Sequence, residues 1–419
     1  MKGAIIAIGD ELCIGDVVNS NAAYLARKCT EIGIPVDRHV TVGDNLEHIV
    51  AELQRLAIEH DLILTTGGLG PTHDDRTKEA IAQFFGVPLQ HSEQAEQWVR
   101  QYLARQHREY TERQATQSTV PACCKPLYNA YGTAPGLWCE KSGFPMVIAL
   151  PGVPAEMRFI VENSVLPELQ QRVRNQPRIL LRTYGIIGIP EAELFEQLSE
   201  DVRRWENEGI TVAFLPSAKL VRLRFRWTAP PSASVEERIA DIESVLRQRF
   251  GRRVIPYDAP LEATIGTLLA ERGETLAVAE SCTGGYLGKR ITDIPGSSRY
   301  FLGGIIVYSN EAKKRFLDVP QEILDTVGAV SREVAELLAA NVRMVFSSTY
   351  GIGITGIAGP GGGTPKKPVG TVWIGIATPS AVTPHLFHFK GDRETIRRAA
   401  TTHALLLLLE QLTATIAAT

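Results

Sequence analysis

Two adjacent nucleophiles follow an apolar run in the C-terminal third of the chain. Ser281 and Cys282 stand in the stretch AESCTGG, which comes directly after the run TLAV. A helical pattern follows, so we expect a strand that ends near Ser281 and a helix that begins there. Backbone N–H groups at the N-terminus of a helix stabilise an alkoxide, a thiolate or an oxyanion. Either side chain could therefore act as a nucleophile, and a turn of small residues that packs a helix onto a sheet is the alternative interpretation.

Two further segments carry groups that a serine nucleophile would need. The stretch VYSNEAK ends in Lys313, and a lysine whose pKa is lowered by burial can take the proton of a serine hydroxyl. A solvated position on a helix is the alternative for this lysine. The glycine-rich stretch ITGIAGPGGG, residues 354–363, follows an apolar run, and its backbone N–H groups suit a phosphate. Arg393 and Arg397 could hold an anion, although surface arginines are commonly only solvated. These features indicate a nucleotide as the substrate class.

These motifs, in this order, resemble the nicotinamide mononucleotide deamidase domain of the CinA family. The resemblance covers residues 259–410 through AESCTGG, PGSSRYFLGGIIVYSNEAK, GAVS, ITGIAGPGGGTPKKPVGTV and GDR. It implies hydrolysis of the carboxamide of nicotinamide mononucleotide to nicotinate mononucleotide and ammonia, without a cofactor. It assigns Ser281 as the nucleophile and places Lys313 and Tyr308 in proton transfer, so Cys282 becomes a neighbour of the nucleophile. We expect N–H groups near residues 283–285 to hold the oxyanion. The candidate substrate-binding residues are Thr283, Gly284, Gly285, Asn310, Thr355, Gly356, Gly359, Gly361, Arg393 and Arg397.

A second glycine-rich segment, TTGGLGPTHDDRT, follows an apolar run in the N-terminal third of the chain. Its glycines can wrap a phosphate, and Asp74 and Asp75 can hold a hard cation such as Mg²⁺ that bridges to phosphate oxygens. Asp10 and Glu11 leave another apolar run, residues 4–8, and we expect them at the same edge of the sheet. The alternative is a turn in which one of the two adjacent aspartates caps the next helix.

This region resembles the molybdopterin-binding, MogA-like domain of the same family. The shared stretches within residues 1–170 are GDELCIGDVVNSN, VGDN, TTGGLGPTHDDRT, GTAPG and LPGVPAEM. The resemblance implies a divalent cation, Mg²⁺ or Co²⁺, and an ADP-ribose pyrophosphatase activity that only some members keep. Binding of cytidylate or molybdopterin without turnover is the alternative. The candidate phosphate-binding residues are Thr66, Gly67, Gly68, Gly70, Asn21 and Asp44, and the candidate metal ligands are Asp10, Glu11, Asp74 and Asp75.

Two details of this region stay open at the level of sequence. The segment 117–128, which contains Cys123 and Cys124, departs from the wording of the family, so the local shape of this loop is undetermined. Glu156 follows another strand exit, and it either binds metal or begins a helix.

The order of apolar and helical segments predicts an α/β protein of three domains. Short β-branched runs alternate with helical patterns at both ends of the chain, which is typical of largely parallel sheets with helices on both faces. The middle segment instead contains a strictly alternating strand at residues 221–227 and a helix at residues 235–250 that Ser234 can cap. We therefore predict two α/β/α domains, residues 1–170 (MogA-like) and 256–419 (amidase), joined by a small α+β, KH-like domain at residues 171–255.

Composition limits the partners and the environment of the chain. Its 419 residues include 44 Lys and Arg and 47 Asp and Glu, so the net charge of −3 offers no electrostatic footprint for nucleic acid. The stretch GIIG, residues 185–188, has the spelling of a KH loop but carries two isoleucines where an exposed basic loop would be expected. The six cysteines form no C-x-x-C pair, which predicts reduced thiols and a cytoplasmic protein. No apolar stretch reaches the roughly 18 residues of a transmembrane helix, so we expect no membrane partner.

Two hypotheses for the whole protein follow from these motifs. The first is a pyridine-nucleotide salvage enzyme whose C-terminal domain hydrolyses nicotinamide mononucleotide and whose N-terminal domain would act on ADP-ribose. The family also implies a homodimer. The second is a non-catalytic protein linked to competence or DNA damage, whose N-terminal domain binds molybdopterin or a nucleotide. The combination of Ser281, Tyr308 and Lys313 favours the enzyme, because a binding protein would not need these side chains together.

Overall fold

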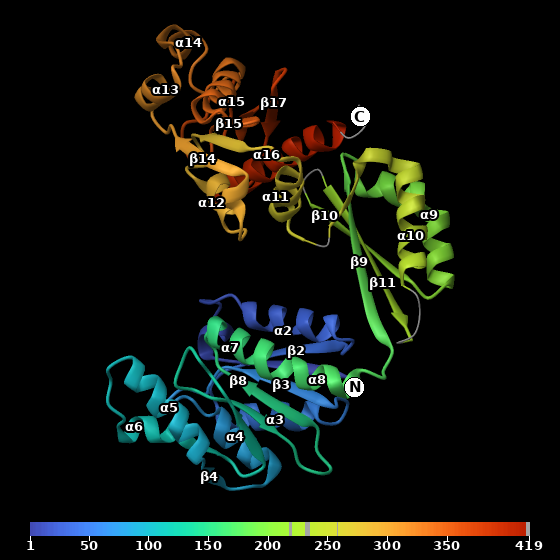
Figure 1. Ribbon diagram of the computed structural model, residues 1–419, viewed down its shortest axis with the longest axis vertical. Coiled ribbons are helices and arrows are strands. Elements are labelled where there is room, and N and C mark those ends of the chain that lie inside the picture. Colours follow the sequence, from blue (N-terminus) through green and yellow to red (C-terminus); the bar gives the residue numbers. More distant parts are fainter. Residues whose placement is uncertain (218–219, 231–234, 258, 416–419) are drawn as a thin grey trace. The chain divides into compact units, whose positions relative to one another are not determined.

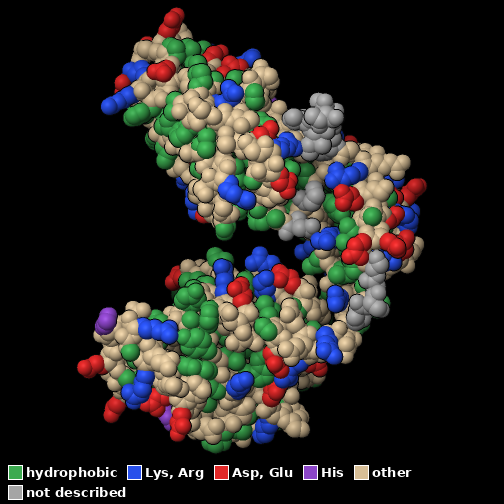
Figure 2. All heavy atoms as spheres, in the orientation of Figure 1, with side chains coloured by type: hydrophobic (Ala, Val, Ile, Leu, Met, Phe, Trp, Pro, Cys, Tyr) green, Lys and Arg blue, Asp and Glu red, His purple; other side chains and the backbone are tan. Residues whose placement is uncertain are grey.

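The computed structural model describes residues 1–217, 220–230, 235–257 and 259–415 of the chain (Figure 1). It divides into two compact units, of which the first comprises Met1–Leu181 with Arg226–Val235 and the second Arg182–Phe225 with Glu236–Thr419. Positive and negative side chains are interspersed on the face of each unit that Figure 2 shows, as their near-equal numbers predict. Within the described ranges, no helix combines the length and the apolar character needed to cross a membrane.

The first unit is built on a six-stranded sheet of order β2-β1-β3-β8-β7-β6. Strands β2, β1, β3 and β8 are parallel, whereas β7 and β6 run antiparallel to their neighbours. The strands are β1 (Gly3–Ile8), β2 (Val36–Val42), β3 (Leu62–Thr66), β6 (Cys124–Leu127), β7 (Gly136–Cys139) and β8 (Met146–Leu150), and β4 (Leu89–His91) pairs separately with β5 (Thr119–Pro121).

Helices cover both faces of this sheet because its central strands are apolar on both sides. One face packs against α3 and α4, and the other packs against α2, α7 and α8. All residues of β1, β3 and β8 are buried, which explains why these strands read as continuous apolar runs in the sequence. The helices of this unit are α1 (Asp10–Cys13), α2 (Ser20–Glu31), α3 (Leu46–Leu56), α4 (Thr77–Phe85), α5 (Glu93–Arg105), α6 (Glu112–Ala115), the 3₁₀ turn η1 (Thr116–Ser118), α7 (Pro154–Ile160), the π-helical turn η2 (Val161–Val165) and α8 (Leu166–Val173).

The middle of the chain forms a four-stranded sheet of order β10-β11-β9-β12 with two helices. Its alternating strand is confirmed as β11, whose side chains from Leu223 onward are buried and exposed in turn. The predicted cap Ser234 lies outside the described residues. The GIIG stretch is not a loop, because residues 185–187 end strand β9 and both isoleucines are buried. The elements are β9 (Arg178–Ile187), β10 (Thr211–Ser217), β11 (Leu220–Ala229), β12 (Val254–Pro256), α9 (Glu191–Asn207), α10 (Glu236–Phe250) and η3 (Gly251–Arg253).

The C-terminal part is a second α/β/α arrangement on a five-stranded sheet of order β14-β13-β15-β16-β17. Strands β14, β13 and β15 are parallel, and β16 and β17 are antiparallel. Helices α11, α12 and α16 cover one face, and α13, α14 and α15 cover the other. The elements are α11 (Leu261–Arg272), β13 (Leu276–Glu280), α12 (Tyr286–Thr292), η4 (Ser297–Arg299), β14 (Phe301–Ile306), α13 (Asn310–Leu317), α14 (Gln321–Thr326), α15 (Arg332–Phe346), β15 (Tyr350–Gly356), β16 (Thr371–Ala377), β17 (Val382–His388) and α16 (Arg393–Thr415).

Glycines let α15 approach this sheet closely. A Cβ atom added to Gly353 of β15 or to Gly375 of β16 would collide with backbone atoms of Ala335 on α15. The helix begins where the sequence predicts, because the Ser331 hydroxyl accepts a hydrogen bond from the N–H of Val334. Helix α15 thereby supports the central strands whose carboxyl ends carry the candidate site.

The two α/β/α arrangements confirm the predicted fold class. The prediction that all six cysteines are reduced is wrong for one pair. Cys124 and Cys139 are direct partners in the β6–β7 register, and their sulfur atoms form a disulfide. The scattered positions of the cysteines in the sequence predict reduced thiols. Antiparallel pairing brings these two together, and the spacing of cysteines along the chain cannot reveal it.

Candidate active site

The C-terminal sheet brings three predicted segments to one edge. Strand β13 lies between β14 and β15, so the chain leaves β13 in one direction and later returns on its other side. Such a switch point in an open parallel sheet opens a crevice at the carboxyl ends of the strands. Ser281 follows β13, Tyr308 follows β14, and Thr355 lies near the end of β15.

The central feature of this edge is a contact between Ser281 and Lys313. The Lys313 Nζ lies 3.1 Å from the Ser281 Oγ, and it also donates to the carbonyl oxygen of Val307 at 2.8 Å. A third and longer contact joins Nζ to the carbonyl oxygen of Tyr308 at 3.5 Å. The Ser281 N–H donates to the carbonyl of Ile354, which holds the turn after β13 against β15. A serine and a lysine in direct contact form a known variant of the nucleophile–base pair.

Helix α13 explains why a lysine occupies this buried position. Ser309 caps the helix by accepting a hydrogen bond from the N–H of Ala312. Lys313 and Leu317 are four residues apart, so they share the face that packs on the sheet, and both are buried. The amine of Lys313 therefore lies at a position where the pattern of the helix calls for an apolar side chain.

Burial changes the protonation of the groups at this site. Desolvation lowers the pKa of Lys313, and no carboxylate among the described residues acts on it to favour the ammonium form. Burial also raises the pKa of the neighbouring Cys282 thiol to about 12. A thiol with such a pKa forms little of the reactive thiolate near neutral pH. Of the two adjacent nucleophiles, Ser281 is thus the one with a base in contact.

Glu280 is a functional residue that the sequence analysis missed. This residue is 1% exposed, and its carboxylate accepts hydrogen bonds from the N–H groups of Gly285, Leu287 and Gly288 at 2.8–3.1 Å. Helix α12 begins only at Tyr286, after a turn in which Gly284 and Gly285 adopt positive φ angles of 57° and 90°. The only signal in the sequence is an acid at the end of an otherwise apolar strand.

The glutamate corrects the expected position of the oxyanion donors. The N–H of Gly285 is bound to Glu280, and the N–H of Gly284 donates to the carbonyl of Ser281. Neither group is free to hold an oxyanion, and the carboxylate offsets the positive end of the α12 dipole. Within the described part of the chain, the N–H groups of Cys282 and Thr283 have no acceptor on another residue.

Two arginines donate hydrogen bonds to backbone carbonyls and to a phenol oxygen around the site. Arg393 donates to the Tyr308 hydroxyl at 2.8 Å and to the carbonyl of Gly359 at 2.7 Å. Arg397 donates to the carbonyl of Thr283 at 2.7 and 3.2 Å. Tyr308 is 59% exposed, and the Lys313 amine approaches its backbone carbonyl at 3.5 Å, whereas its hydroxyl accepts from Arg393.

Among the described residues, the remaining predicted binding residues form no hydrogen bond with the amine of Lys313. The Thr355 hydroxyl donates to the carbonyl of Ala329 at 2.7 Å. The buried hydroxyl of Thr283 has no hydrogen-bond partner among the described residues. Asn310 is the exposed first residue of α13, and the loop with Gly356, Gly359 and Gly361 leaves β15 next to Arg393.

The N-terminal sheet forms a separate cavity of about 440 Å³ at its own strand exits. Strand β1 lies between β2 and β3, which again makes a switch point. Gly67 has a φ angle of 109°, and a Cβ atom there would collide with the carbonyl of Ile8, so only glycine fits. The residues that line the cavity include Gly9, Glu11, Asp44, Gly67, Gly68, Gly70, Asp74, Asp75, Thr133, Gly152 and Glu156.

The predicted acids differ in the groups that their carboxylates contact. Asp75 accepts the N–H of Gly70 at 2.8 Å and the N–H of Thr72 at 2.9 Å, so it holds its own loop. Neither Asp74 nor Asp75 caps α4, whose cap position is Arg76. The N–H of Asp10 donates to the Asp44 carboxylate at 3.0 Å, and the N–H of Asp44 donates to the Asp10 carboxylate at 3.2 Å. Asp10 does not line the cavity.

The acids that face the cavity repel one another. The pKa of Asp44 is raised by burial and by the negative charges of Asp10, Glu11 and Asp74. In the described residues, no group of three or more His, Cys, Asp or Glu side chains is arranged to hold a metal ion. These carboxylates therefore do not form a complete protein cage. They suit Mg²⁺ only in its commoner mode, with one or two carboxylates and the phosphates of a substrate.

Two predicted phosphate-binding residues do not face this cavity. Asn21 donates to the Thr66 hydroxyl at 2.9 Å and to the carbonyl of Gly152 at 2.8 Å, and Thr66 in turn donates to Pro151. Together they hold the loop after β8 and line a smaller recess of about 90 Å³. Glu156 lies in the first turn of α7 and faces the cavity, where burial raises its pKa although Asn129 donates to it at 2.6 Å.

Comparisons with known proteins cover most of the chain. Family models match at residues 258–412 (CinA C-terminal domain), 4–171 (probable molybdopterin binding domain) and 181–255 (damage-inducible protein CinA KH domain). A CinA-like protein of Salinibacter ruber is 41% identical over 394 residues, which cover 94% of this chain and 95% of that protein. A putative competence-damage inducible protein of Halothermothrix orenii is 41% identical over 414 residues, with coverages of 98% and 99%. The crystal structure of the competence/damage inducible protein CihA from Agrobacterium tumefaciens shares 37% identity over 36% of this chain and 92% of its own, with a TM-score of 0.35.

The role of Glu280 is testable by removing its charge. In Glu280→Gln the single amide oxygen cannot accept all three N–H groups, and the amide N–H₂ faces other donors. We expect a loss of about 3 kcal/mol in the free energy of unfolding of the C-terminal domain, measured by denaturant titration. Glu333→Gln, an exposed acid in the first turn of α15, is the matched control and should change stability by less than about 0.5 kcal/mol. Equal effects of the two substitutions would contradict the role given to Glu280.

Proposed function

The chain belongs to the CinA family, and from this membership and the Ser281–Lys313 contact we propose that its C-terminal domain hydrolyses nicotinamide mononucleotide. The products are nicotinate mononucleotide and ammonia. The observation that carries the proposal is the 3.1 Å distance between the Ser281 Oγ and the amine of Lys313. This amine is buried without a carboxylate among the described residues that would hold it in the charged form.

The neutral amine of Lys313 has the hydrogen-bond groups that a base for Ser281 needs. Its two N–H bonds can point to the carbonyls of Val307 and Tyr308, and its lone pair is then left for the serine proton. As the proton moves to Nζ, the Ser281 oxygen forms a bond to the carboxamide carbon. The ammonium of Lys313 then returns the proton to the amide nitrogen, and ammonia leaves.

The second half of the reaction restores the enzyme. A water molecule gives a proton to the neutral Lys313 as its oxygen attacks the acyl carbon. When the bond to Ser281 breaks, the Lys313 ammonium returns this proton to the Ser281 oxygen, and the product acid ionises to the carboxylate. The oxyanion of both steps would be held by the N–H groups of Cys282 and Thr283, the donors in this turn without an acceptor on another described residue. We place the phosphate of the substrate near Arg393 and the adjoining glycine loop, since Arg393 is exposed and already fixed to Gly359.

For the N-terminal domain we propose ADP-ribose hydrolysis that depends on a divalent cation. The support is the cavity in which Glu11, Asp44 and Asp74 face the glycine loop of residues 67–70. Bound with the substrate, the cation would neutralise the charge of the pyrophosphate. The residues of the chain would position the phosphates through the loop N–H groups. Binding of molybdopterin or cytidylate without turnover is the competing function of this domain.

Substitution of the two adjacent nucleophiles distinguishes their roles. We expect Ser281→Ala to lower the rate of ammonia release from nicotinamide mononucleotide by about 10⁴-fold, because the attacking oxygen is removed. Cys282→Ala should stay within about threefold of the unaltered protein, because its thiol has a pKa of about 12. The opposite pattern, with activity kept by Ser281→Ala and lost by Cys282→Ala, would overturn the assignment.

The pH dependence of the amidase activity tests Lys313 as the base. The amine works only when it is neutral, so kcat/KM should rise with pH through the pKa of Lys313 and then level off. Because burial lowers this pKa, the rise should occur below the ordinary lysine range. Lys313→Arg should be inactive throughout, since a guanidinium keeps its proton. A profile that is flat between about pH 5 and pH 10 would exclude this lysine as the base.

Substitution of Asp74 tests the cation requirement of the N-terminal domain. This change leaves intact the hydrogen bonds that Asp75 accepts within its loop. We expect the protein to release AMP from ADP-ribose with Mg²⁺ or Co²⁺, and Asp74→Asn to need about tenfold more metal for half-maximal rate. Glu59→Gln, an exposed acid outside the cavity, should leave the metal titration unchanged. If the unaltered protein releases no AMP with either metal, this domain is a binding domain.

A further inference from the structure

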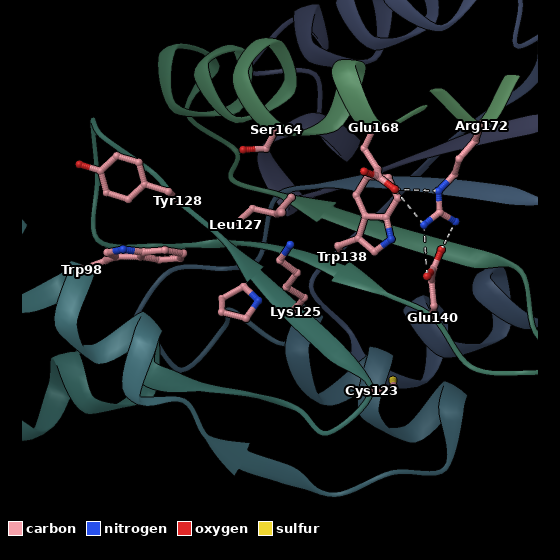
Figure 3. Close-up of a pocket in the computed structure, with 11 residues that line it drawn as sticks. Trp98, Cys123, Lys125, Leu127, Tyr128, Trp138, Glu140, Ser164, Glu168 and Arg172 are labelled. Carbon is pink, nitrogen blue, oxygen red and sulfur yellow. Dashed lines mark hydrogen bonds and ion pairs between the residues drawn. The ribbon is translucent and has the colours of Figure 1, made fainter. Parts of the chain in front are cut away.

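The first unit contains another cavity, of about 630 Å³, on the antiparallel side of its sheet (Figure 3). It lies between Trp98 on α5, strands β6 and β7, and the segment formed by η2 and α8. It shares no lining residue with the cavity at the glycine loop. Its volume is in the range of pockets that hold small molecules.

Aromatic side chains form much of the wall of this cavity. Trp98 and Tyr128 are half-buried and meet edge to face, with ring centroids 5.3 Å apart. Trp138 is 7% exposed and lies on β7, with the Arg172 guanidinium 5.1 Å from its ring centroid. Indole and phenol faces of this kind favour a flat aromatic occupant, because stacking on them is tolerant of the identity of the ring.

Two cationic side chains line the cavity, Arg172 and Lys125, and they differ in their partners. Arg172 is held by two acids, Glu168 at 3.2 Å and Glu140, so its charge is more than neutralised. Lys125 on β6 points into the cavity between the two indoles in Figure 3, and it has no hydrogen-bond or ion-pair partner among the described residues. An anionic group on the occupant would therefore find its partner in Lys125.

A disulfide and a π-helical turn are part of these walls. The disulfide between Cys124 and Cys139 joins β6 to β7, the strands that carry Lys125 and Trp138. The helix on the opposite wall contains the π-helical turn η2, and Ser164 within this turn lines the cavity. Single π-helical turns are rare and often occur at functional sites.

From these observations we propose that this cavity is a second small-molecule site, independent of the two sites described above. Its ligand is a flat heteroaromatic ring that carries one anionic group, either a carboxylate or a phosphate. The ring stacks on Trp98, and the anionic group pairs with the ammonium of Lys125.

The test uses calorimetric titration of the full-length protein with two matched pairs of probes. Indole-3-acetate against indole-3-ethanol tests a carboxylate, and AMP against adenosine tests a phosphate. In at least one pair, we expect the anion to bind about fivefold tighter than its neutral partner. The pair that shows this difference identifies the anionic group.

Substitutions in the wall assign the binding to this cavity. Lys125→Met should abolish the difference between the anion and its neutral partner, whereas Trp98→Leu should weaken both by about tenfold and Trp98→Tyr should retain most of the affinity. Asp74→Asn should change none of these values, because Asp74 lines the other cavity. The amidase rate should be unchanged in all the wall variants.

Two results would overturn the proposal. One is a dissociation constant weaker than about 5 mM for both anions. The other is an affinity that Lys125→Met and Trp98→Leu leave unchanged, since the probe would then bind elsewhere on the protein.

Discussion

The C-terminal site depends on one constraint, a lysine amine that is buried against a serine hydroxyl without a counter-ion among the described residues. Burial makes the neutral amine favourable, and the carbonyls of Val307 and Tyr308 supply acceptors for its N–H groups. These contacts require β14 to end at Ile306 and α13 to begin within one turn of Lys313, which the Ser309 cap ensures. The capped helix and the switch in strand order together bring two residues 32 positions apart into contact.

Glu280 shows how a carboxylate can stabilise a nucleophile loop while opposing its expected electrostatics. A helix terminus next to a serine suggests a ready site for negative charge, but this terminus already binds a buried carboxylate. The turn is held rigid by that acid and by Arg397 on the carbonyl of Thr283. In the proposed reaction, stabilisation of an oxyanion would then fall to the N–H groups upstream of the helix, in the turn itself. Preorganisation of the loop and binding of the anion would thus be performed by different N–H groups.

The sequence predicts the fold well where burial is complete, and poorly where pairing decides the structure. Strands such as β1, β3 and β13 are buried on both faces and appear as apolar runs. The edge strand β17 is largely exposed, and the β6–β7 hairpin with its disulfide depends on register, so neither has a clear pattern in the sequence. At the site, motifs pointed to Ser281 and Lys313 by resemblance. Glu280 was missed because its partners are backbone N–H groups, which have no side-chain identity to detect.

Acids at strand exits follow one pattern in both α/β/α arrangements. In each, a carboxylate that accepts loop N–H groups serves the loop, as Glu280 does after β13 and Asp75 does near β3. The adjacent Asp74 is exposed, and hydrogen bonds with the Thr72 side chain and with its own backbone lower its pKa. The pKa of Asp44 is instead raised, since burial and neighbouring acids outweigh the one N–H bond it accepts from Asp10. The N–H groups that a carboxylate already accepts therefore limit its capacity for a ligand or a cation, in addition to its place in a motif.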